Sequence, residues 1–196
     1  MADIYNHRCR WFVALFLMCA AYPRPVAADF ASFQQELVEA EKLRITDPKR
    51  FDAVLDQLER EKEDATPAQL DYLSYLRAYD FLVYKNEPEI SIQLAKQLFS
   101  KTRDQDLKFR TGSFLVNTYA SSRHFSEGLR LLNQTLPMRD KVVDKDVRHT
   151  GINGAGIFYN EMGQYALGLR YAEEVLSDQP SRRNRCVAGM YRQEAL

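Results

Sequence analysis

The chain has few of the residues that carry metal or disulfide chemistry: three cysteines and three histidines among 196 residues. Cys9 and Cys19 lie in the first 28 residues, which leaves Cys186 alone in the remainder. One cysteine cannot form an internal disulfide, so a disulfide-stapled scaffold is excluded. His124 and His149 have no further Cys or His at ligand spacing, so we predict no metal site.

An excess of charge is also missing. The 27 basic side chains balance 27 acidic ones, giving a formal net charge of zero. A nucleic-acid-binding domain normally has a basic excess, so nucleic acid is not an expected partner. No stretch alternates convincingly between apolar and polar residues, and we therefore predict an all-α chain with essentially no sheet.

The sequence also lacks the common catalytic motifs. It has no G-x-S-x-G and no P-loop, and Cys186 has no evident base near it. Gly151, Gly154 and Gly156 do not match the dinucleotide fingerprint, and close helix packing explains them better. We predict no catalytic residue and no cofactor. A small-molecule enzyme would need an acid/base set that the sequence does not offer.

Residues 1–28 have the features of a secretory signal peptide. Arg8 and Arg10 precede an uncharged apolar run over residues 11–21, and small residues follow at 26–28. The run is about half the ~20 residues that a membrane-spanning helix needs. We expect cleavage after Ala28, periplasmic or secreted location in a bacterium, and no stable membrane insertion afterwards. Retention as an anchor and lipidation of Cys19 are the alternatives.

Residues 151–180 predict a pair of amphipathic helices. One apolar face comes from residues before Gly163 and a second from residues after it, and Pro180 ends the unit. The same pattern occurs three more times upstream. Its anchors in the second helix of each pair are Val54, Ser91, Gly128 and Gly168, and successive anchors are 37, 37 and 40 residues apart. The first-helix anchor recurs at Ile45, Leu82, Tyr119 and Tyr159.

Four helix pairs are therefore expected near residues 30–64, 67–101, 106–137 and 145–179, with a partial fifth over 182–196. Together they form one domain, 29–196. Asp47 before Pro48 and Thr66 before Pro67 are helix-start signals. In the last helix, Cys186 is expected to be buried. No further helix is predicted after it to cover the apolar face of this last helix, which favours a fragment of a longer protein.

This pattern resembles the tetratricopeptide repeat, although Ala155 stands where Leu is usual and Gly168 where Ala is usual. The resemblance implies a right-handed α-solenoid of antiparallel helix pairs. It also implies a concave groove, lined by the first helix of each pair, that binds a peptide or protein. Mapping the anchors places six candidate contacts in the groove: Asp80, Tyr84, Arg110, Asn117, Asn153 and Asn160. Asn amides can pair with a peptide backbone, and Arg110 can hold a carboxylate.

The signal peptide, the long helix pairs and the segment 180–196 together resemble the periplasmic sensor region of bacterial membrane-bound diguanylate cyclases. That resemblance implies a sensory fragment, with dimerisation through a longer signalling protein. The chain has no second hydrophobic span and no Gly-Gly-Asp/Glu-Glu-Phe motif, so cyclase activity is not expected in it. An interaction module and a sensor fragment both stay open, and the coding sequence beyond Leu196 would distinguish them.

Overall fold

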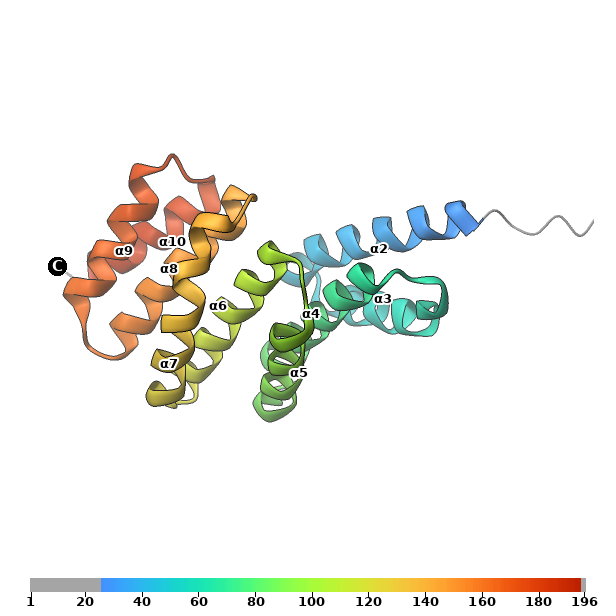
Figure 1. Ribbon diagram of the computed structural model, residues 1–196, viewed down its shortest axis with the longest axis horizontal. Coiled ribbons are helices and arrows are strands. Elements are labelled where there is room, and N and C mark those ends of the chain that lie inside the picture. The colour runs from blue at the N-terminus through green and yellow to red at the C-terminus, as the bar shows by residue number, and fades with distance from the viewer. Residues whose placement is uncertain (1–25, 195–196) are drawn as a thin grey trace, which may run out of the picture.

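The computed structural model describes residues 26–194, and every regular element in that range is helical, as predicted (Figure 1). The predicted signal sequence, including Cys9 and Cys19, lies outside the described residues except for positions 26–28, which open the first helix. No helix within residues 26–194 is long and apolar enough to cross a membrane.

Nine α-helices and two short 3₁₀ helices make up this range. In chain order they are α2 (Val26–Thr46), α3 (Pro48–Arg60), η1 (Lys62–Asp64), α4 (Pro67–Val83), α5 (Pro88–Lys101), α6 (Gln105–Ser121), α7 (Phe125–Thr135), η2 (Leu136–Lys141), α8 (Lys145–Glu161), α9 (Tyr165–Ser177) and α10 (Arg182–Glu194).

Helices α3, α4, α6 and α8 each begin where a short polar side chain accepts from free backbone amides. Asp47 accepts from the amide of Arg50 at 3.1 Å, with Pro48 next in sequence. Thr66 and Gln69 form a reciprocal capping box at the start of α4. Both predicted start signals are confirmed, because these side chains replace hydrogen bonds that the first turn of a helix lacks.

Two of the turns between helices are alike. Between α6 and α7, the amide of His124 donates to Tyr119 O at 2.8 Å, and between α8 and α9 Gln164 donates to Tyr159 O at the same distance. Between α4 and α5 the matching bond joins Glu87 to Phe81 O at 2.8 Å, so this turn holds one more residue than the other two. The residue of α4 equivalent to Tyr119 is therefore Phe81 rather than the predicted Leu82.

The helices pack in sequence. Each of α2, α4, α6 and α8 lies against the helix that follows it, and α8 also packs on α6 and α10. Figure 1 shows α2 to α5 at one end and α8 to α10 at the other, with α6 between them. Helices α4 and α6 contact each other over only a few residues. The buried apolar side chains form successive clusters between neighbouring helices.

The second-helix anchors mostly lie at close contacts. Ser91 is fully buried and donates to Ala78 O at 2.6 Å, and Gly128 and Gly168 are also buried. The first pair differs, because Val54 is only partly buried and Ile45 is 56% exposed. Ile45 is therefore not equivalent to Tyr119, which is 9% exposed, because α2 reaches α3 through a single intervening residue, Asp47.

Two single-residue interpretations also need correction. Cys186 is exposed on α10, whose inward face instead carries Asn184 and Ala188. His149, expected at the surface or in a turn, is 2% exposed inside α8, where its Nε2 lies 2.9 Å from Oδ2 of Asp178. The partner carboxylate, 29 residues away in sequence, satisfies a ring nitrogen that the helix has buried.

Candidate functional site

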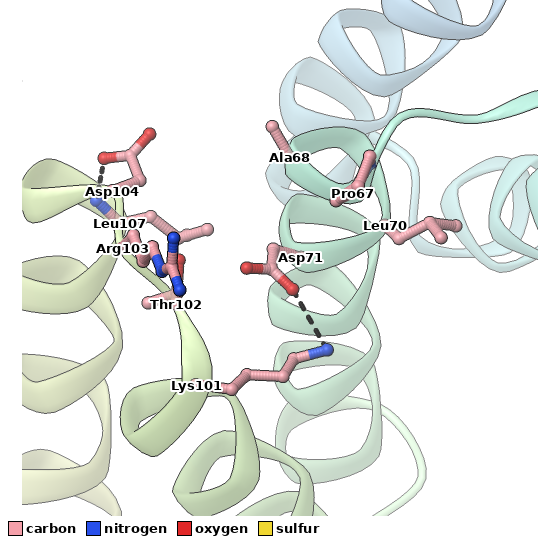
Figure 2. A pocket seen from close by; sticks show the side chains of 9 residues that line it. All are labelled: Pro67, Ala68, Leu70, Asp71, Lys101, Thr102, Arg103, Asp104 and Leu107. Carbon is pink, nitrogen blue, oxygen red and sulfur yellow. Dashed lines mark hydrogen bonds and ion pairs between the residues drawn. The ribbon is translucent and has the colours of Figure 1, made fainter.

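A cleft with a volume of about 540 Å³ lies where α4 begins and α5 passes into α6. Figure 2 shows Asp71 and Lys101 joined across it, with a distance of 3.0 Å between Nζ and Oδ1. Asp104 caps α6 by accepting from the Leu107 amide at 2.9 Å. Because these groups already pair with other groups of the chain, the cleft offers a ligand mainly apolar surface.

A smaller cavity has a different character. It has a volume of about 160 Å³ and is called the arginine pocket below. The side chains and backbone that line it belong to Arg44, Tyr75, Tyr79, Arg110, Ser113, Phe114, Asn117, Val147, Thr150, Gly151 and Arg183. All of these residues lie on α2, α4, α6, α8 and α10, the alternate helices of the chain. None is acidic.

Arg110 is fixed in place by α4 and α2. Its Nη1 donates to the Tyr72 hydroxyl at 2.7 Å, and its Nη2 lies 3.5 Å from Oε1 of Glu41. The guanidinium also lies over the Tyr75 ring, 5.3 Å from its centroid. These contacts hold the planar cation in one orientation at the pocket wall.

Arg44 is the most deeply buried cation of the pocket, at 5% exposure. Its Nη2 pairs with Oε1 of Glu41 at 2.9 Å, and its guanidinium lies 4.7 Å from the Tyr79 ring centroid. Its Nε is buried without a hydrogen-bond partner. A buried donor without a partner costs about 1–3 kcal/mol.

Arg183 contributes the third guanidinium, from the opposite end of the described chain. It is exposed, and none of the described carboxylates pairs with it. Glu41 is thus the only described carboxylate paired with these arginines. The pocket therefore keeps a positive excess.

The pKa values of Arg110, Tyr75 and Tyr72 are all raised above their ordinary values. Burial lowers the pKa of Arg110, but the Tyr75 and Tyr72 hydroxyls and the Glu41 carboxylate outweigh it and hold the pKa above its ordinary value. Burial raises the pKa of Tyr75 and of Tyr72. The arginine stays charged and both phenols stay neutral.

Asn117 supplies an acceptor beside these donors. Its Oδ1 is buried without a hydrogen-bond partner, whereas its Nδ2 faces Gly154 of α8. A side chain at position 154 would meet Nδ2 at 2.9 Å, so glycine there lets α8 approach the amide. Arg110 and Asn117 are the two predicted groove residues that line the pocket.

Asn153 and Asn160 lie on α8 but are engaged by α10. Asn153 is 4% exposed and donates to the backbone oxygen and Oδ1 of Asn184 at 3.1 and 3.2 Å. Asn160 donates to Tyr191 O at 3.4 Å. These amides bind backbone, as their chemistry suggested, but the backbone is that of the chain's own last helix.

Tyr84 and Asp80 do not line the pocket. Tyr84 is 37% exposed and its hydroxyl donates to the backbone oxygen of Arg44. Asp80 is fully buried and lies 3.0 Å from Nζ of Lys85 and 3.6 Å from Nη1 of Arg77. Its assignment to an open groove is therefore corrected: it neutralises cations between α3 and α4.

The error at Asp80 has a geometric origin. The extra residue of the α4–α5 turn shifts the first helix by one position relative to the second, and one residue turns a helix by about 100°. The equivalents of Ser113 and Asn117 in α4 are therefore Tyr75 and Tyr79, whose rings face the pocket. Neither tyrosine is among the six predicted groove residues.

Sequence reasoning also missed Arg44 and Arg183. Arg44 lies in the pair whose two helices are joined by a single residue, Asp47, and Arg183 follows Pro180 near the end of the described chain. Their convergence with Arg110 required the packed structure.

The pocket has donors, aromatic faces and one free acceptor, which suits binding of an anionic group. It contains no pair of titratable groups arranged for proton transfer. Among the described residues, no three His, Cys, Asp or Glu side chains form a metal-binding group. No protein-family model matches the chain, and comparison with curated proteins and with solved structures found no significant similarity.

Proposed function

We propose that this chain is an exported, tetratricopeptide-like interaction module whose stacked helix pairs form a right-handed solenoid. Its concave face binds an extended peptide or a segment of a partner protein. The observation that supports the proposal is the origin of the arginine pocket, since its lining comes from alternate helices and from none of α3, α5, α7 and α9. A stack of helix pairs presents its first helices along one face in this way.

The chemistry of the face fits a peptide. Arg110 is held in an orientation in which it can donate to a carboxylate, because Tyr72, Tyr75 and Glu41 fix the plane of its guanidinium. Asn117 lines the same pocket, and an amide side chain can pair with a peptide backbone. The tyrosine rings offer apolar contact beside these polar groups.

The test uses peptides selected from a random displayed library against the purified protein. Arg110→Ala and Asn117→Ala should each weaken binding of a selected peptide by about tenfold or more, the value of one hydrogen bond to a charged or buried group. Arg170→Ala is the matched control, because Arg170 is exposed on α9, away from the pocket. Equal affinity of all three variants, or failure to enrich any peptide, contradicts the proposal.

A further inference from the structure

We propose that the arginine pocket binds a phosphate monoester as its dianion. This inference rests on the proposed function, because it names the chemical group that the proposed concave face selects. The group would enter between α2, α6 and α10, with Arg44, Arg110 and Arg183 as its ligands.

The charge count points to a dianion. Three guanidinium groups line the pocket, and Glu41 is the described carboxylate that pairs with two of them, Arg44 and Arg110. Two positive charges are left over. A phosphate monoester carries about −1.5 to −2 charges at pH 7, whereas a single carboxylate carries one.

The geometry favours an anion with three equivalent oxygens. The three arginines come from α2, α6 and α10: Nη2 of Arg44 and Nη2 of Arg110 both lie at Oε1 of Glu41, and Arg183 lines the cavity from the last helix. A planar carboxylate has two oxygens and would leave one of these cations unpaired. Guanidinium forks match phosphate oxygens well.

Arg44 keeps unused hydrogen-bonding capacity beside the cavity. Nε of Arg44 has no hydrogen-bond partner although the side chain is only 6% exposed. The volume of about 160 Å³ is below the roughly 300–1,000 Å³ of pockets for drug-sized ligands. The pocket is therefore sized for one anionic group, with the rest of its bearer lying along the face.

The experiment titrates the purified protein with phenyl phosphate, inorganic phosphate and succinate by calorimetry. Phenyl phosphate should bind at least tenfold more tightly than succinate. Its affinity should rise from pH 5 to 7.5, because the second phosphate ionisation has a pKa of about 6. Glu41, the three arginines, Tyr72, Tyr75 and Tyr79 are the titratable groups around the pocket, and no histidine is among its lining residues.

Variants of opposite sign separate binding from folding. Arg183→Gln, on an exposed side chain, should weaken phenyl phosphate about tenfold while leaving the melting temperature unchanged. Glu41→Gln removes the internal competitor and should tighten binding severalfold. Arg170→Gln on α9 is the charge-matched control and should have no effect. A merely structural role for these residues cannot produce the gain at position 41.

These experiments distinguish a failure of the phosphate assignment from a failure of the interaction-module proposal. Tighter binding of phosphate to the wild type, with loss in Arg183→Gln and gain in Glu41→Gln, supports the inference. Succinate binding as tightly as phenyl phosphate overturns it, as does no phosphate binding at millimolar concentration. If selected peptides still bind through Arg110 in either of those cases, the interaction-module proposal stands and only the phosphate assignment falls.

Discussion

A Cβ atom on Gly168 would lie 2.7 Å from Cγ of Asn160, so α9 can approach α8 only because residue 168 has no side chain. Asn160 is 9% exposed and donates to α10, which leaves it little room to move. The absence of a side chain at Gly168 therefore allows α8, α9 and α10 to pack together around Asn160.

Gly168→Ala should lower the free energy of unfolding by about 1–3 kcal/mol, the usual cost of forcing a methyl group into a packed interior. Asn160→Ala in the same chain should restore part of the loss by making room. Urea denaturation of both single variants and the double variant gives the coupling energy. Strict additivity would mean that the two residues do not compete for the same space.

Gly151→Ala should destabilise the protein by a similar ~1–3 kcal/mol, because its methyl group would lie 2.5 Å from Cζ of the buried Phe109 ring and 2.7 Å from Ser113 Oγ. Gly189→Ala is the control, since a Cβ there meets no atom within 4 Å. In a helix interior that change should stabilise by about 0.5–1 kcal/mol. Thermal denaturation showing equal effects at both positions would rule out close packing at Gly151.

Asp80→Asn should reduce stability by about 1–3 kcal/mol, because it leaves the cations beside this buried residue with less compensation. It should not change the affinity of a selected peptide, since Asp80 lies outside the pocket. Denaturant melts and peptide titration on the same preparation measure both quantities. A large loss of affinity in a fully folded variant would return Asp80 to the binding face.

Asp178 should stabilise the protein at neutral pH but not in strong acid. Hydrogen bonds from His149, and next from Arg148, hold the pKa of its carboxyl below the ordinary 3.8. A depressed folded-state pKa contributes stability above the unfolded value and loses it as pH falls through the folded value.

The difference in melting temperature between wild type and Asp178→Asn should therefore be full above about pH 5 and shrink below pH 3.8. Asp140→Asn, at a side chain that is 86% exposed, should show no such difference. A gap that stays constant down to pH 2 would mean that Asp178 acts through packing alone.

Export in a bacterial host should yield a mature protein that begins at Asp29, because the apolar run is too short to anchor and small residues precede that position. Amino-terminal sequencing of the exported protein measures this. An unprocessed amino terminus, or an acylated Cys19, would contradict it. The sensor-fragment alternative also stays a prediction, to be decided by the coding sequence beyond Leu196.

The helical class could be predicted from the sequence because its causes are local. Asp47 and Thr66 cap helices through neighbours three residues away, and the apolar periodicity extends over whole helices. The residues of α4 that face the pocket could not be predicted in this way, because the extra residue in the α4–α5 turn rotates α4 relative to α5. For that reason Tyr79, and not Asp80, is the residue of α4 equivalent to Asn117.

The pocket itself depends on contacts between residues far apart in sequence. Arg110 was found because it lies on a helix with regular spacing, whereas Arg44 and Arg183 lie at the two ends where the pattern weakens. The partner of His149 is likewise 29 residues away, which no local pattern reveals. Charge convergence of this kind appears only after the helices are packed.

Arg44 and Arg183 come from the first and last helices of the described range, yet both line one cavity. A ligand held by both would act as a clasp between the two ends of the chain. Peeling away either terminal helix would then require the clasp to open first. Occupancy should therefore suppress fraying at both ends together, and hydrogen exchange would report it as simultaneous protection of α2 and α10.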